Sequence, residues 1–320
     1  ISAEIRFNKS MNFDEINKYR GYGMRYSYKP STSLILGAGN VSCIPLLDAI
    51  YHIVTKRSVT IIKLNPVNDY LLPVYEKIFE EFINKGYMVV TKGNTEESKN
   101  MVKHKGIDHI HLTGSDITYE NIVYGHTLTQ EERKLKTIRK ENNKTFTSEL
   151  GNVTPIIVHP GKWSSSEIKY QARKIVTTKL NNGGFNCISG QIVVLPDGWK
   201  HTDKLIKYIK YYMKNVEDRF SYYPNSIETL NLLEKDKNYK RENGPNCVTP
   251  HLTREIKAYS KYETNEVWAT SIYFKKIQYN NVSDYTDKVI EYCNNELWGN
   301  LGATVLFKNY KSQKNKKFLN

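Results

Sequence analysis

The chain has 320 residues, of which 39% are hydrophobic and 25% charged, so it is long enough for two packed domains and too mixed in composition to be disordered. No stretch approaches the uninterrupted apolar length that a membrane-spanning helix needs, so the sequence predicts a soluble protein with no membrane span. Lysine and arginine exceed aspartate and glutamate by 47 − 33 = +14, but the basic residues are spread along the chain, which argues against nucleic-acid binding.

Compartment and metal content follow from simple sequence features. Residues 1–20 contain no apolar core of signal-peptide length, so we expect a cytoplasmic protein, or a mitochondrial-matrix protein if the N-terminus has been processed. The four cysteines lie far apart with no CxxC pair, and the histidines show no ligand spacing with a carboxylate partner. The sequence therefore predicts free thiols and no metal site.

The first third of the chain repeats a short β-branched apolar run, turn residues and a longer stretch with helical spacing. The expected strands are 33–36, 59–64, 87–91 and 109–113. The expected helices are 44–56, 70–85 and 96–104, and Gly86 fits the C-terminal cap of the second. Strands joined by crossover helices form a parallel sheet that binds ligands at the carboxyl ends of its strands. We therefore expect a Rossmann-type domain over residues 1–148.

The pattern changes near residue 147, where a second α/β domain is expected over residues 149–308. Its expected strands are 155–159, 191–195, 271–276 and 303–307. Its expected helices are 165–180, 204–213 and 284–297. The remaining residues, 309–320, form a polar basic tail. The fold class is thus α/β, with a parallel-sheet domain followed by a second α/β domain.

One cysteine stands in an unusual setting. Residues 181–191 read NNGGFNCISGQ, so Cys187 follows a glycine-rich turn at the end of a helix. A thiol there can meet a substrate and be activated by backbone dipoles, although a free cysteine more often just packs in a core. The pair Gly37 and Gly39 after the first strand is weak evidence for a dinucleotide site, because Ser42 stands where the third glycine would be.

Several further segments fall into one recognisable order. Residues 149–152, ELGN, are similar to a glutamate motif E-L-G-G, and the residues leading to Cys187 are similar to a cysteine segment with asparagine and glycine before the nucleophile. Similar short matches occur at Asn40, at 59–63 (VTIIK), 111–115 (HLTGS), 266–268 (EVW) and 297–303 (LWGNLGA). In this order the segments resemble the aldehyde dehydrogenase superfamily, in a divergent and poorly characterised branch.

The resemblance implies the roles of nine residues. Cys187 would be the nucleophile, Glu149 the general base, and the Asn40 side chain an oxyanion donor together with the Cys187 backbone N–H. The implied cofactor-binding residues are Lys63, Gly114, Ser115, Leu150, Glu266 and Trp268. The implied cofactor is NAD or NADP, bound by the domain of residues 1–148, and the implied partners are a small-molecule aldehyde and further copies of the chain in a homo-oligomer.

The implied reaction is oxidation of an aldehyde to a carboxylic acid through a cysteine thioester. Thiolate attack on the aldehyde carbon gives a tetrahedral adduct, and hydride transfer to the nicotinamide leaves a thioester. Water deprotonated by Glu149 then releases the acid. A carboxylate acting as base near neutrality needs a raised pKa, so we expect Glu149 to be partly buried.

The sequence also departs from the family pattern. Lys63 is followed by Leu64, Asn65 and Pro66, which lacks the usual ribose-binding glutamate and leaves NAD against NADP open. Tyr119 stands where the family has a glycine beside the pyrophosphate, and we expect it to crowd that site. The family's N-terminal stretch and C-terminal oligomerisation segment are not recognisable, so the chain is expected to be a shortened relative or part of a longer protein.

Two alternatives stay open. An acyl-CoA reductase would form the same thioester in reverse, but it would not need Glu149 as a base. A catalytically inactive scaffold would explain the missing glutamate and Tyr119, but it would have no need to keep Cys187, Glu149 and Asn40 together.

Overall fold

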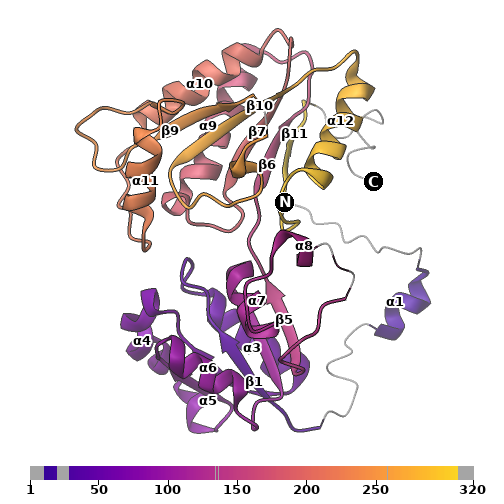
Figure 1. The fold of residues 1–320 in the computed structure, drawn as a ribbon, viewed down its shortest axis with the longest axis vertical. Coiled ribbons are helices and arrows are strands. Elements are labelled where there is room, and N and C mark those ends of the chain that lie inside the picture. The colour runs from indigo at the N-terminus through magenta and orange to yellow at the C-terminus, as the bar shows by residue number, and fades with distance from the viewer. Residues whose placement is uncertain (1–10, 20–28, 134, 136, 258, 309–320) are drawn as a thin grey trace. The chain divides into compact units, whose positions relative to one another are not determined.

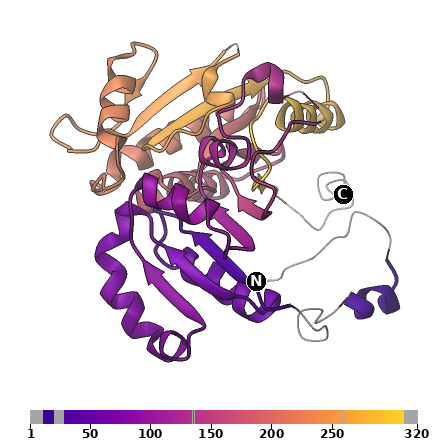
Figure 2. The same cartoon turned by 60° about the horizontal axis from the view of Figure 1, so that its bottom comes forward.

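The computed structural model describes residues 11–19, 29–133, 135, 137–257 and 259–308, so the expected basic tail at 309–320 lies outside the described residues. The chain divides into two compact units, unit 1 over Ile1–Ser148 and unit 2 over Glu149–Asn320. Each unit has its own sheet, flanked by helices of the same unit (Figures 1 and 2).

Unit 1 contains a five-stranded sheet in the order β3-β2-β1-β4-β5. Its strands are β1 (Thr32–Leu36), β2 (Val59–Lys63), β3 (Met88–Thr91), β4 (His109–Thr113) and β5 (Thr145–Glu149). The pairs β1–β2, β1–β4 and β2–β3 are parallel, which confirms the expected parallel sheet. This order is that of a Rossmann-type sheet, in which the strand order reverses direction beside β1.

Of the three helices expected in unit 1, those at 44–56 and 96–104 are present, and the structure adds helices that the sequence did not predict. The helices of unit 1 are α1 (Phe13–Tyr19), α3 (Ile44–Lys56), η1 (Pro66–Leu71), α4 (Leu72–Ile78), α5 (Glu80–Asn84), α6 (Thr95–Lys103), α7 (Asp116–Val123) and α8 (Gln130–Arg133). The single helix expected over 70–85 is wrong, because the chain leaves helical geometry at Phe79 (φ −109°, ψ 21°). Phe79 is buried in the core beside the sheet, so tertiary packing overrides the helical pattern there. Gly86 follows α5 with φ +75°, as expected of a glycine that ends a helix.

Unit 2 contains a six-stranded sheet in the order β11-β6-β7-β10-β9-β8. Its strands are β6 (Thr154–Val158), β7 (Gly190–Pro196), β8 (Lys240–Arg241), β9 (Leu252–Ile256), β10 (Ser271–Ile277) and β11 (Thr304–Leu306). Every pair is parallel except β8 with β9. Each expected strand of this domain is present, and together with the sheet of unit 1 this confirms the α/β fold class.

Helices cover both faces of the second sheet. They are α9 (Ser165–Leu180), η2 (Asn181–Gly184), α10 (Thr202–Asn215), α11 (Ser226–Lys235), η3 (Lys261–Glu263) and α12 (Val282–Asn295). Alternate residues of the central strands face opposite cores: Ile156 and Val193 pack with α9 and α10, whereas Ile157 and Val194 pack with α12. Burial on both faces explains why these strands are continuous apolar runs.

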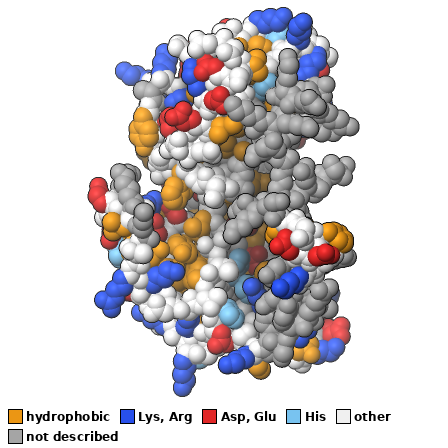
Figure 3. All heavy atoms as spheres, turned by 90° about the vertical axis from the view of Figure 1, so that its right-hand side faces the viewer, with side chains coloured by type: hydrophobic (Ala, Val, Ile, Leu, Met, Phe, Trp, Pro, Cys, Tyr) orange, Lys and Arg blue, Asp and Glu red, His pale blue; other side chains and the backbone are white. Residues whose placement is uncertain are grey.

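Among the described residues no helix is long and apolar enough to cross a membrane. Nor do the described residues contain a group of three histidine, cysteine or acidic side chains placed to hold a metal ion. On the face drawn in Figure 3 the described lysine and arginine side chains are scattered among other residues rather than gathered in one patch.

Candidate functional site

Four of the predicted site residues lie at the carboxyl ends of strands in the unit 1 sheet. Because β1, β2 and β4 are parallel, their carboxyl ends meet at one edge of the sheet, and Asn40, Lys63, Gly114 and Ser115 lie at or just beyond these ends. Asn40 is 8% exposed and Lys63 is 7% exposed, whereas Gly114 and Ser115 are exposed. This edge is therefore the place in unit 1 where a ligand would meet several predicted residues at once.

The loop after β1 is tightly held. The Gly37 N–H donates to the Lys63 carbonyl oxygen at 3.0 Å, and the Asn68 side-chain amide donates to the Ala38 carbonyl oxygen at 3.1 Å. A Cβ at Gly39 would lie 2.7 Å from the Asn65 side chain, so this residue is a glycine because the backbone approaches its neighbour closely. The glycines of this loop thus have a packing reason beside any role in binding a ligand.

Lys63 is largely buried at the end of β2. Burial lowers the pKa of its ammonium group, while the more distant carboxylates of Asp69 and Glu97 partly oppose that shift. Within the part of the chain that the structure describes, the Lys63 ammonium makes no hydrogen bond. The hydroxyl or phosphate oxygens of a nucleotide would accept hydrogen bonds from the ammonium group of this largely buried residue.

At the carboxyl end of β4 the chain turns into α7. The Ser115 hydroxyl accepts a hydrogen bond from the Thr118 N–H at 3.1 Å and caps the helix. The Tyr119 ring packs against Phe146 and Tyr124, with ring centroids 5.3 and 6.2 Å away. The crowding of the pyrophosphate by Tyr119 therefore stays a prediction, since its ring has packing partners in unit 1.

Unit 2 holds Cys187 in a turn that we call the Cys187 turn, residues 181–189. The turn is left-handed at Asn182, Gly183 and Gly184, with φ of 52°, 63° and 85°. A Cβ at Gly184 would lie 2.8 Å from the Ala269 carbonyl oxygen, so both the backbone angle and the close contact require a glycine. These glycines let the chain leave α9 and present Cys187, half-buried, before β7 begins.

The thiol is not activated in the way that the turn suggested. Burial raises the pKa of Cys187, and the carboxylates of Glu149 and then Glu266 raise it further. The backbone N–H groups of Cys187 and Ile188 act in the opposite direction, because they stabilise a thiolate, but their effect is smaller. The backbone dipoles thus lower this pKa as expected, but burial and the two carboxylates outweigh them, so the net shift of the thiol pKa is upward.

Glu149 ends β5 and is exposed, so the partial burial expected for it is not found. The reason is local: β5 is an edge strand of its sheet, and most of its residues are exposed. Glu149 is nevertheless close enough to Cys187 for its charge to act on the thiol. Leu150 follows it and is partly exposed.

Glu266 and Trp268 lie on what we call the Glu266 segment, residues 262–268. A Cβ at Gly151 would lie 1.9 Å from Glu266 Oε2, so the glycine of the ELGN motif leaves room for this carboxylate. Trp268 belongs to an aromatic cluster in which its ring lies 4.8 Å from Tyr223 and 6.5 Å from Phe185. Unit 2 thus brings Cys187, Glu149, Glu266 and their neighbours into one region.

The sequence did not predict a role for two polar residues of this region, Lys179 and Gln191. Lys179 Nζ donates to the Val267 carbonyl oxygen at 2.9 Å, and Gln191 bonds three backbone groups. Gln191 Nε2 donates to the carbonyl oxygens of Tyr262 (2.8 Å) and Asn265 (2.9 Å), and its Oε1 accepts from the Val267 N–H (2.7 Å). A signal for Lys179 was available, since it continues the apolar stripe of α9 through Ala172, Ile175 and Val176.

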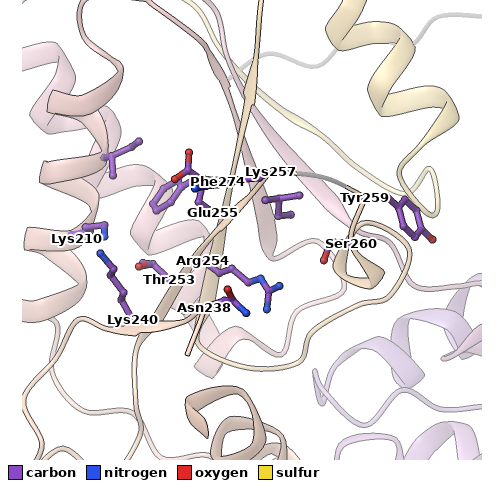
Figure 4. A pocket seen from close by; sticks show the side chains of 12 residues that line it. Lys210, Asn238, Lys240, Thr253, Arg254, Glu255, Lys257, Tyr259, Ser260 and Phe274 are labelled. Atoms are coloured by element: carbon purple, nitrogen blue, oxygen red, sulfur yellow. The ribbon is translucent and has the colours of Figure 1, made fainter. Parts of the chain in front are cut away.

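A cavity of about 490 Å³ lies elsewhere in unit 2, between α10 and strands β8 and β9 (Figure 4). Its cationic lining residues include Lys210 and Arg254, which pair with Glu242 at 3.1 Å and Asp236 at 2.6 Å. The cavity shares no residue with the Cys187 turn or the Glu266 segment. It is therefore not the site that the sequence predicted.

A family model described as the aldehyde dehydrogenase family matches residues 40–219, which is more than half of the chain. The chain therefore belongs to the aldehyde dehydrogenase family. The matched range includes Cys187, Glu149 and Lys63, whereas Glu266 and Trp268 lie outside it. No curated protein sequence matches the chain.

Solved structures share the fold at low sequence identity. Gamma-glutamyl-gamma-aminobutyraldehyde dehydrogenase from Burkholderia cenocepacia matches with a TM-score of 0.65 and 17% identity, over 88% of this chain and 56% of that one. Succinic semialdehyde dehydrogenase from Streptococcus pyogenes, solved with NADP+, gives 0.64 and 17%, over 89% and 61%. An aldehyde dehydrogenase from Bartonella henselae gives 0.66 and 13%, over 91% and 59%. The chain thus spans less than two thirds of the length of these proteins.

Proposed function

We propose that the protein oxidises an aldehyde to a carboxylic acid with NAD or NADP, through a thioester on Cys187. The observation that carries the proposal is the setting of Cys187 in unit 2. In its glycine-rich turn the Phe185 ring stacks with Trp268 of the Glu266 segment, and the charges of Glu149 and Glu266 both act on its thiol. Membership of the aldehyde dehydrogenase family and the dehydrogenase folds of the similar structures support this chemistry.

The residues of unit 1 fit a dinucleotide. Lys63 is 7% exposed and ends β2, at the carboxyl ends of the parallel strands where Rossmann-type sheets bind ligands. We propose that Lys63 binds the adenosine ribose and that Gly114 and Ser115 lie near the pyrophosphate. Leu150, Glu266 and Trp268 would contact the nicotinamide end. When bound, NAD or NADP supplies the hydride acceptor for oxidation of the aldehyde carbon.

The chain's own residues account for the other steps. Cys187 must lose its proton, which passes to solvent water, and its sulfur then attacks the aldehyde carbon, which forms a carbon–sulfur bond and places negative charge on the aldehyde oxygen. The Cys187 and Ile188 N–H groups, which already stabilise the thiolate, can donate to that oxygen. Glu149 takes a proton from water, the hydroxide attacks the thioester carbonyl carbon, and the sulfur leaves to restore Cys187. Asn40 stays a proposed second oxyanion donor.

One observation favours a second candidate, a catalytically inactive aldehyde-dehydrogenase-like scaffold. The pKa of Cys187 is raised, which leaves less thiolate near neutral pH than a free cysteine would have. The two candidates differ in whether any aldehyde is turned over.

The test is NAD(P)H formation by the purified protein with a panel of aliphatic, aromatic and carboxylated aldehydes. We expect turnover with at least one aldehyde, and Cys187→Ala should abolish it while leaving cofactor binding intact. Cys247→Ala is the matched control, because that cysteine lies outside the proposed site. Turnover retained in Cys187→Ala would contradict the mechanism, and cofactor binding without turnover would favour the scaffold.

We also propose that the protein is a cytoplasmic homo-oligomer, with a small-molecule aldehyde as its partner. Light scattering of the purified protein would give its mass in solution and test the oligomer.

A further inference from the structure

Two buried polar side chains tie the Glu266 segment to the elements that flank the Cys187 turn. Lys179 stands in the last turn of α9, before the Cys187 turn, and Gln191 stands near the start of β7, after it. Gln191 is 2% exposed and Lys179 is 1% exposed, so water cannot satisfy their polar atoms. The four hydrogen bonds given above all end on the backbone of the Glu266 segment.

These bonds fix more than one point of the segment. Gln191 alone bonds the backbone of Tyr262, Asn265 and Val267. These three residues extend along most of the segment, and Val267 lies between Glu266 and Trp268. Lys179 holds the carbonyl side of Val267 while Gln191 holds its N–H side. These two groups belong to the peptide units on either side of the Val267 Cα, so rotation of either unit would break a bond and leave a buried polar group unpaired.

A separate contact shows how closely the turn packs against Ala269, the residue directly after the segment. The Gly184 Cα approaches the Ala269 carbonyl so closely that an added Cβ would lie only 2.8 Å from the oxygen. Electrostatics couple the same parts, since Glu266 acts on the Cys187 thiol and on the Lys179 ammonium. Movement of the segment would therefore change the pKa of the Cys187 thiol.

We infer that Gln191 and Lys179 are positioning residues, which hold Glu266 and Trp268 in place relative to the Cys187 thiol. The inference rests on the proposed function, in which Glu266 and Trp268 contact the nicotinamide end of the cofactor. The hydrogen bonds that carry it lie entirely within unit 2. Their effect on backbone exchange and on the Cys187 thiol can be measured without turnover.

The first experiment measures the segment directly. Gln191→Leu removes all three bonds at nearly constant volume, and Gln278→Leu is the matched control on an exposed glutamine just after β10. Hydrogen exchange followed by mass spectrometry should show about tenfold faster exchange at residues 265–268 in Gln191→Leu, because the Val267 N–H loses its acceptor. The control should exchange like the unmodified protein.

The second experiment reads the thiol. Because the Glu266 carboxylate raises the pKa of Cys187, its displacement in Gln191→Leu should move the pH profile of Cys187 alkylation to lower pH. A folded Gln191→Leu variant with unchanged exchange and an unchanged alkylation profile would overturn the inference. If that variant does not fold, Gln191→Met, whose uncharged side chain is close to glutamine in length, removes the same three bonds and should show the same changes. No change there would equally overturn the inference.

Measurements of turnover distinguish a failure of the inference from a failure of the proposed function. If the protein is a dehydrogenase, Lys179→Met should raise the KM for NAD(P) by about tenfold to a hundredfold and leave the KM for the aldehyde nearly unchanged. Lys174→Met, on the exposed face of the same helix, should change neither. Equal effects on both KM values would overturn the positioning role. An unmodified protein without turnover would contradict the proposed function alone, and the exchange and alkylation results would still decide the inference.

Discussion

Gly184→Ala should destabilise unit 2 more than the same change at a glycine with open surroundings. Gly184 has φ +85°, and a left-handed conformation costs an alanine about 1–2 kcal/mol. The new Cβ would also lie 2.8 Å from the Ala269 carbonyl oxygen, and overpacking of this kind adds roughly 1–3 kcal/mol. Gly198 has φ +77° with no heavy atom within 4 Å of its added Cβ, so Gly198→Ala should carry only the conformational cost.

Urea unfolding followed by tryptophan fluorescence measures this difference. All four tryptophans of the chain lie in unit 2, so the signal reports that unit. We expect the free energy of unfolding to fall by roughly 2–5 kcal/mol in Gly184→Ala and by about 1–2 kcal/mol in Gly198→Ala. Equal losses in the two variants would refute the contact between the Cys187 turn and Ala269.

Three further predictions concern charge. Glu149→Gln removes a carboxylate that raises the pKa of Cys187, so the pH profile of Cys187 alkylation should move to lower pH, whereas an unmoved profile would place the two groups apart. Lys63→Met should weaken NAD(P) binding by about tenfold to 150-fold in isothermal titration, since a lost charge-assisted hydrogen bond is worth roughly 1.5–3 kcal/mol, and the exposed Lys77→Met should not. Glu167 accepts hydrogen bonds from the Ser164 N–H and hydroxyl, which lowers its pKa to about 2. A depressed pKa adds stability that is present above the unfolded-state value near 4.5 and is lost as the pH falls toward 2. Glu167→Gln should therefore make the free energy of unfolding less dependent on pH between about 4.5 and 2. An unchanged pH dependence in this range would contradict the prediction.

Much of the fold was predictable because local patterns were strong. The helix at 44–56, the helix at 165–180 and the strand at 109–113 have the expected bounds, since each combines clear periodicity with turn residues or caps at its ends. Strand β9 was missed because Arg254 and Glu255 interrupt its apolar pattern. Strand β5 was missed because it is an exposed edge strand, and such strands need little apolar sequence.

The candidate site was predictable only in part. Cys187, Glu149 and Lys63 stand in segments with family-like motifs, so the sequence alone singled them out. Gln191 and Lys179 could not be assigned partners, because their hydrogen bonds reach residues 71 to 88 positions away in the chain. The burial of Glu149 was wrongly expected, because exposure depends on where an edge strand ends and not on neighbouring residue types.

The most direct test of the account is a search for the acyl-enzyme on Cys187. Glu149→Gln should slow hydrolysis of the thioester, so mixing this variant with NAD(P) and a turned-over aldehyde, followed by acid quench, should trap the intermediate. Peptide mass spectrometry should then find the acyl group on the peptide that contains Cys187 and on no peptide of Cys187→Ala. Steady turnover with no acyl group on Cys187, or with the group on another residue, would contradict the account.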